Sequence, residues 1–150
     1  MDIQLSLAEV HQTRQLLENT DYPEVSSMQD AVSTLEKHNG DLETSFQELW
    51  QEQVGDLGTP ETGDKSLWEV TLKVLRDELC GDEGFRSKIL DYNKNPGSAS
   101  ILTGAIVYLV GLTTLPINPA IATIVVLYLV KVGLNIFCEY TEPSQADEAS

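Results

Sequence analysis

The side chains that could do chemistry are few and widely spaced in this 150-residue chain. Two histidines, His11 and His38, could act as general bases or metal ligands, and two cysteines, Cys80 and Cys138, as nucleophiles or metal ligands. No two of these residues have the spacing of a zinc motif. The acids around Cys80 disfavour a thiolate. We therefore expect a protein that is not an enzyme, with no catalytic residue, metal, cofactor or small-molecule substrate.

The two cysteines and residues 1–20 also give information on the cellular compartment of the protein. Two cysteines are too few for a disulfide framework, and they fit a reducing environment. Cys138 follows an apolar run, so we expect it to behave as a small hydrophobic residue. Residues 1–20 carry acids and no continuous apolar run, and no signal peptide is expected there.

The charge is distributed unevenly along the chain. Nine basic and 24 acidic residues give a net charge of −15, of which −11 belongs to residues 1–65 and −4 to residues 139–150. Residues 98–138 contain a single charged side chain, Lys131. The acidic excess argues against binding to bare nucleic acid, and against docking on anionic lipid headgroups through charge. The chain therefore has two acidic ends and an apolar stretch that must be buried or inserted.

Three short amphipathic helices are expected in residues 1–53, which we call the head. A capping box, Ser6-Leu-Ala-Glu9, begins the first helix. The second runs from residue 26 or 27 to residue 38, where Asn39-Gly40 supplies a left-handed stop. Asp41 can cap the third helix. Apolar residues recur at helical spacing at Leu7, Val10, Leu16, Leu17, Met28, Ala31, Val32, Leu35, Leu42, Phe46, Leu49 and Trp50.

The head resembles a ubiquitin-associated (UBA) domain over residues 8–52, a three-helix unit that also opens elongation factor Ts. The resemblance rests on Tyr22-Pro-Glu, Ala31-Val-x-x-Leu35, Asn39-Gly-Asp-Leu-Glu43 and Phe46-x-x-Leu49. UBA domains bind partner proteins through the first loop and the third helix. The resemblance therefore implies a cytosolic protein partner that contacts Tyr22, Pro23, Phe46, Leu49 and Trp50. Phe46 and Leu49 could equally be core residues, whereas Trp50 lies near the helix end and is the better contact candidate.

The middle of the chain predicts a linker followed by two amphipathic helices. Residues 54–65 are rich in glycine and contain a proline, which favours a flexible linker. Residues 66–140 begin with a helix whose apolar residues, from Trp68 to Leu79, share one side. A second helix follows, which Asp82 can cap. Residues 141–150 are small and polar, and we expect a disordered acidic tail there.

Residues 95–130 form an uncharged block that Pro116-Ile-Asn-Pro119 divides. Asn118 is a good N-cap and Pro119 a favourable first helical residue, so we expect a hairpin of two helices, 98–115 and 119–138. Their hydropathy is typical of membrane spans, and their lengths of about 26 and 30 Å approach the bilayer core of about 30 Å. Basic residues before the first helix place both termini in the cytoplasm.

Several residues of this hairpin are candidates for membrane or oligomer contacts. The glycines leave space for close helix contact, the tyrosines need hydroxyl partners near mid-helix, and the lysine could reach a membrane interface. The candidates are Gly104, Tyr108, Gly111, Tyr128, Lys131 and Gly133.

Three functions remain open for this all-α chain, of which the weakest is an enzyme subunit whose catalytic partner is another chain. In the first, it is a non-enzymatic protein-interaction module that the hairpin tethers to a membrane, either for recruitment or as an effector that disturbs the membrane when the head is engaged. In the second, it is a soluble cytoplasmic module that oligomerises through residues 98–138. Oligomers are invoked because two short amphipathic helices cannot cover both apolar helices.

Overall fold

The computed structural model describes residues 4–18, 20, 23–54, 67–95, 97–115 and 117–140. Within these residues the protein is all-α, as predicted, and the only extended pairing is an isolated bridge between Gln4 and Asp41. Most of the predicted linker and the whole acidic tail lie outside the described residues. The helices are α1 (Leu7–Glu18), α2 (Val25–Lys37), α3 (Leu42–Val54), α4 (Leu67–Leu79), α5 (Glu83–Lys94), α6 (Ala99–Leu112), α7 (Pro119–Val132) and α8 (Leu134–Tyr140).

The predicted helix caps are confirmed where the structure describes them. The Glu9 N–H donates to Ser6 Oγ at 3.1 Å and the Ser6 N–H donates to Glu9 Oε1 at 2.8 Å, which completes the capping box of α1. Asn118 caps α7 by accepting the Ile121 N–H at 2.9 Å, and Pro119 is the first residue of that helix. Asp41 and Asp82 cap α3 and α5 in the same way, as predicted, and Ser98 caps α6, which was not predicted from the sequence.

The turn between α2 and α3 holds the N-terminal segment of the chain. Asn39 and Gly40 adopt φ angles of 58° and 86°, the left-handed stop that the sequence predicts. The Leu5 N–H donates to the Gly40 carbonyl at 2.9 Å. A Cβ at Gly40 would collide with the backbone of Leu5, so this close approach requires glycine.

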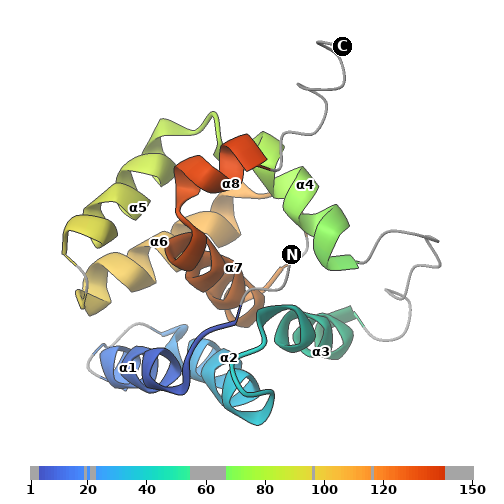
Figure 1. The fold of residues 1–150 in the computed structure, drawn as a ribbon, viewed down its shortest axis with the longest axis vertical. Coiled ribbons are helices and arrows are strands. Elements are labelled where there is room, and N and C mark those ends of the chain that lie inside the picture. The colour runs from blue at the N-terminus through green and yellow to red at the C-terminus, as the bar shows by residue number, and fades with distance from the viewer. Residues whose placement is uncertain are drawn as a thin grey trace.

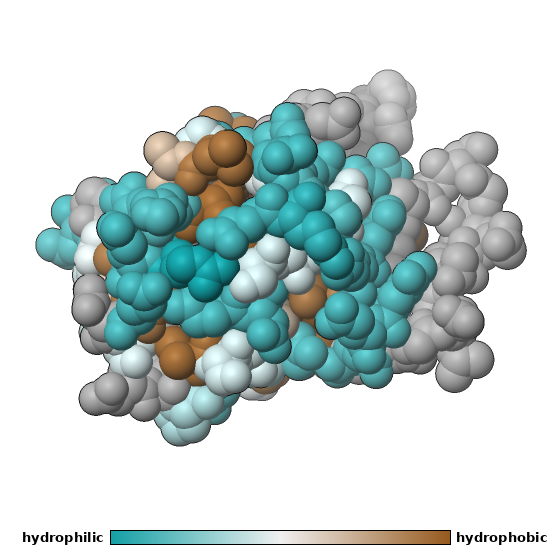
Figure 2. All heavy atoms as spheres, turned by 90° about the horizontal axis from the view of Figure 1, so that it is seen from below, coloured by the Kyte–Doolittle hydropathy of each residue, from teal (hydrophilic) through white to brown (hydrophobic). Residues whose placement is uncertain are grey.

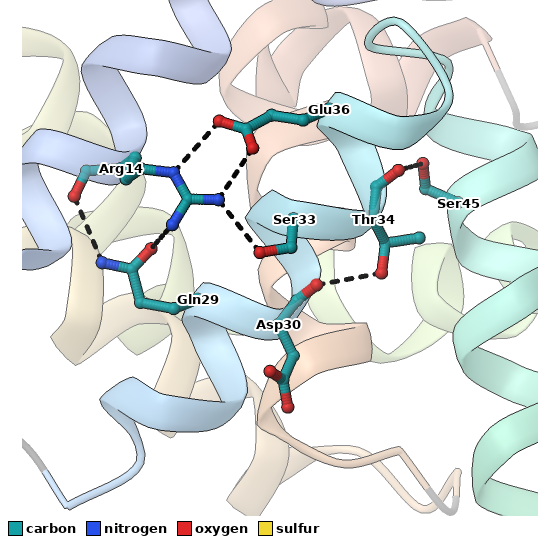
Figure 3. Close-up of polar contacts among 7 residues, drawn as sticks. All are labelled: Arg14, Gln29, Asp30, Ser33, Thr34, Glu36 and Ser45. Carbon is teal, nitrogen blue, oxygen red and sulfur yellow. Dashed lines mark hydrogen bonds and ion pairs between the residues drawn. The ribbon is translucent and has the colours of Figure 1, made fainter.

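A polar network joins α1 to α2 around Arg14 (Figure 3). The guanidinium donates to Glu36 twice, at 2.9 and 3.0 Å, and to Ser33 at 3.0 Å. Gln29 donates to the Arg14 carbonyl at 3.2 Å. The hydrogen bond to Glu36 raises the pKa of Arg14, and the same contact lowers the pKa of Glu36. This network fixes how the first two head helices cross.

Helix α7 lies at the centre of the fold, with the other helices arranged around it (Figure 1). Helices α2 and α3 of the head pack on it, as do α6 and α8. Every residue from Ala120 to Leu129 is buried. The head therefore supplies cover for α7 beyond that of the two amphipathic helices, a contribution that the sequence did not predict.

The apolar helices are shorter than the sequence predicts. Helix α6 ends at Leu112, and α7 ends at Val132 because Gly133 adopts a φ of 98° and directs the chain into α8. Each has 14 residues, which gives a length of about 21 Å at 1.5 Å per residue. Among the described residues, no helix combines the length and apolar character needed to cross a membrane. This finding does not support the predicted transmembrane hairpin.

Cys80 and Cys138 form a disulfide, contrary to the expectation of two reduced cysteines. Their Cα atoms are 5.8 Å apart, although 58 positions separate them in the sequence. Cys80 directly follows α4, and Cys138 lies in α8. Sequence spacing could not reveal this pair, because the two residues meet only after α8 folds back over the core.

The surface on the side of the head is mostly hydrophilic. Figure 2 views the molecule from this side and shows a largely polar face with small hydrophobic patches. Within the described residues, the exposed large hydrophobic side chains are Leu7, Val70, Leu90 and Ile136. Leu7, which shares the helical spacing of the buried Val10 and Leu17, is 62% exposed and contributes little to the core.

Candidate functional site

A series of aromatic contacts joins the head to the hairpin and forms the candidate functional site. Phe46 of α3 lies 5.8 Å from Trp50 between ring centroids and meets Trp68 of α4 edge-on at 5.1 Å. Trp68 meets Tyr128 of α7 edge-on at 5.2 Å, and Tyr128 meets Phe137 of α8 edge-on at 6.1 Å. Edge-to-face pairs contribute roughly 0.5–1.5 kcal/mol each beyond the burial of their area. We call these five residues the aromatic bridge.

The aromatic bridge contains the residue that the sequence marks as the best surface contact. Trp50 is only 8% exposed, because α3 packs against α7 and α4. Trp50 is therefore inaccessible to a partner in this conformation, and its role as a contact residue stays a prediction. Its Nε1 is buried and finds no hydrogen-bond partner among the described residues, which makes the burial of this ring less favourable than that of Phe46.

The other predicted partner-binding residues have different environments. Phe46 and Leu49 are buried beside Trp50 on the inner face of α3. Pro23 is exposed in the turn before α2, and Tyr22 lies outside the described residues. The structure thus buries three of the five residues, and among them Phe46 contacts Trp68 of α4. Their role in binding a partner stays a prediction.

The predicted hairpin glycines do not make close helix contacts within this chain. Nothing lies within 4 Å of a Cβ built at Gly104, Gly111 or Gly133. Gly104 and Gly111 lie on α6, the first half-buried and the second exposed. Self-association through this side of α6 stays a prediction. Gly133 has a different role, because it ends α7.

Tyr108 finds the hydroxyl partner that its mid-helix position requires. It donates to Asp82 Oδ1 at 2.8 Å, and the same carboxylate accepts the Phe85 N–H at 2.8 Å as the cap of α5. The hydrogen bond from Phe85, with that from Tyr108, lowers the pKa of Asp82, while the bond to Asp82 raises the pKa of Tyr108. A Cβ at Gly84 would collide with the Tyr108 hydroxyl, so glycine permits this approach of α5 to α6.

Lys131 pairs with an acid of the head. Its Nζ lies 2.9 Å from Glu9 Oε1, and both side chains are about two-fifths exposed, at 38% and 41%. The backbone hydrogen bond from Ser6, followed by that from Lys131, lowers the pKa of Glu9. Exposed pairs contribute about 0–1 kcal/mol, so this contact links α1 to the end of α7 but adds little to the stability of the fold.

A second polar contact, which the sequence did not suggest, holds the end of α6. Glu78 of α4 accepts hydrogen bonds from the hydroxyls of Thr113 and Thr114 and from the Thr114 N–H. Burial opposes the charge of Glu78, but these hydrogen bonds outweigh it and lower its pKa. Glu78 lies on the polar side of an amphipathic helix, and its helical position does not distinguish it from a solvated acid.

The aromatic residues at the contact with the hairpin were only partly predictable from the sequence. Trp68 belongs to the apolar stripe that the sequence predicts for α4, and Tyr128 was a hairpin candidate. Phe137 was missed, because the predicted helix 119–138 leaves no sign that the chain reverses at Gly133. A glycine within an apolar run is the one signal that could have indicated the break.

The two histidines, which could act as general bases or metal ligands, do not belong to the aromatic bridge. His11 is exposed, and His38 lies with Nε2 at 2.8 Å from Glu48 Oε1. Among the residues that the structure describes, no group of three or more His, Cys, Asp or Glu is placed to hold a metal ion.

No protein-family model, curated protein or solved structure matches the chain. The UBA-like character of the head stays a prediction from its residues.

Proposed function

We propose that this chain is a non-enzymatic interaction module in which the head and the hydrophobic hairpin hold each other inactive. A protein partner binds the head, displaces the hairpin, and leaves it free to act on a membrane. The observation that supports the proposal is the aromatic bridge: Phe46 and Trp50, expected at a partner-binding face, are buried at the contact with α4 and α7.

Competition for one face explains how the two parts would be coupled. A partner that contacts Phe46, Leu49 and Trp50 cannot reach them while α3 packs on α7. Its binding energy would therefore favour an open conformation, as any ligand favours the state for which it has higher affinity. Opening would expose the apolar surface of α7, which must then find another apolar environment.

The net charge of the chain determines which lipid vesicles are suitable for testing membrane binding. The acidic ends carry most of the net charge of −15, so anionic headgroups would repel them. Vesicles of phosphatidylcholine avoid this repulsion. Exposed α7 would bind them through burial of apolar area rather than through charge.

The test is flotation of the full chain with phosphatidylcholine vesicles, with Phe46→Ala as the opening variant. Removing this ring breaks the contact between α3 and Trp68, and we expect the vesicle-bound fraction to rise several-fold. Leu7→Ala is the matched control, because it truncates an exposed apolar residue of the head. A tryptophan emission shift without any gain in vesicle binding would contradict the proposal.

The second candidate is a soluble module that oligomerises through residues 98–138. The original reason for oligomers was cover of both apolar helices. Helix α7 is enclosed within one chain, but the side of α6 that bears Gly104 and Gly111 still offers open surface. Light scattering of the full chain without detergent separates the candidates. A mass that is a multiple of one chain, reduced to one chain by Gly111→Leu, would favour the oligomer.

A further inference from the structure

One residue decides whether the apolar segment after Pro119 is one helix or two. Gly133 has φ 98° and ψ 130°, and its N–H donates to the Leu129 carbonyl at 2.7 Å. Among the described residues, no atom would lie within 4 Å of a Cβ at this position, so a larger side chain would fit here. Glycine adopts helical and left-handed backbone angles with similar ease, so the backbone of Gly133 itself can become helical at small cost.

A straightened segment would have a new property. Helix α7 alone has 14 residues and is about 21 Å long. Joined through Gly133 to the seven residues of α8, it would extend over residues 119–140 and measure about 33 Å. That length exceeds the bilayer core of about 30 Å, which neither helix reaches alone.

Helix α8 packs against α7 in the bent position. Leu134 and Phe137 are buried, and Phe137 contacts Tyr128 edge-on. Ile136, on the opposite side, is 56% exposed. The strongest restraint is covalent, because the disulfide joins Cys138 to Cys80 at the end of α4.

The disulfide is within reach of a reductant. Cys80 and Cys138 are both only partly buried. Cys80 also lines an open surface groove with Gly81, Ser87 and Leu90. A small-molecule dithiol or the exposed thiol of a redox protein could therefore approach the bond without prior unfolding.

We infer that the Cys80–Cys138 disulfide is a redox latch that keeps α8 folded back at Gly133. A dithiol reductant attacks the S–S bond by thiol–disulfide exchange, and both cysteines become thiols as the reductant becomes a disulfide. Two electrons and two protons pass from the reductant to the latch. Helix α8 then continues α7 as one apolar helix that is long enough to enter a membrane. This inference rests on the proposed membrane action of the hairpin.

The experiment compares the full chain, oxidised and reduced with dithiothreitol, by hydrogen exchange and by flotation with phosphatidylcholine vesicles. Reduction should raise amide exchange at residues 133–140 at least tenfold in the absence of vesicles, with α1–α3 unchanged. It should also raise the vesicle-bound fraction several-fold. Cys138→Ser should behave as the reduced chain and should not respond to dithiothreitol.

A pair of glycine variants tests the hinge itself. Gly133→Ala penalises the bent backbone, because alanine rarely adopts a φ of 98°. In reduced protein it should raise vesicle binding roughly tenfold over reduced wild type. Gly97→Ala is the matched control: Gly97 has φ 100° with nothing near its Cβ, but it lies in the loop before α6. Equal effects of the two variants would overturn the hinge.

The outcomes separate the latch from the proposed function. If Phe46→Ala binds vesicles in oxidised form but reduction of wild type changes neither exchange nor binding, the latch is rejected and the proposed function stands. If neither Phe46→Ala nor reduction produces binding, both are rejected. Loss of protection throughout α1–α3 on reduction would also overturn the latch, because the disulfide would then stabilise the whole fold.

Discussion

Truncation of Phe46 tests whether the head and the hairpin share one core. The side chain is fully buried, and its ring contacts Trp50 within the head and Trp68 outside it. Phe→Ala in a core lowers the free energy of unfolding by about 3–5 kcal/mol. Domains of this size are typically stable by about 5–15 kcal/mol, so the variant should remain folded but should lose a large part of its stability.

The assay is urea unfolding followed by two signals. Far-UV circular dichroism reports all helices, and tryptophan emission reports Trp50 and Trp68, the two tryptophans of the chain. With a urea m-value of about 2 kcal/mol/M, the midpoint should fall by about 2 M in both signals. The two curves should coincide for wild type and for Phe46→Ala, because one cooperative core gives one transition.

Two transitions would refute the reasoning. If the head were an independent domain, Phe46→Ala would shift an early, partial loss of helix and leave a second transition of the hairpin unchanged. Leu7→Ala provides the control, since this exposed head residue should shift the midpoint by less than about 0.3 M, corresponding to about 0.5 kcal/mol.

The remaining predictions concern the backbone and the acids. Gly40→Ala should destabilise the fold by at least about 2 kcal/mol more than Gly97→Ala, as measured by thermal unfolding. Both glycines have positive φ, but only at Gly40 would the new Cβ collide with Leu5. Burial opposes the charge of Glu78, but hydrogen bonds such as that from Thr113 outweigh it and lower the pKa of Glu78 in the folded state. Glu78 therefore stabilises the fold above its ordinary pKa of 4.5, and this stabilisation is lost as the pH falls below 4.5 through the lowered pKa. The stability difference between wild type and Glu78→Gln should therefore shrink between pH 6 and pH 3, and a constant difference would contradict the assignment.

The starts of the helices and the end of α2 were predictable because their causes are local, whereas α6 and α7 end earlier than predicted. Capping boxes, N-cap side chains and left-handed stops act within four residues, and the structure confirms them at Glu9, Asn118 and Gly40. The apolar stripes of α2 and α4 were equally readable, and their residues from Met28 to Leu35 and from Trp68 to Leu79 are buried. These signals establish an all-α chain with an apolar hairpin.

The candidate site was less predictable because it depends on which helices meet. Periodicity marked Phe46, Trp68 and Tyr128 as apolar residues of three separate helices, but it carries no information on their mutual contacts. Trp50 was expected at the surface because its position near the helix end, considered alone, suggests exposure. Its burial follows from the packing of α3 against α7 and α4.

The sequence by itself determined the helices, their caps and the concentration of charge in the two ends. The tertiary structure decided what covers α7, where the apolar segment bends, and which cysteines pair. The physical reason is the range of the interactions. Caps and periodicity involve neighbours in the chain, whereas the cover of α7 by the head and the pairing of Cys80 with Cys138 join residues 58 or more positions apart.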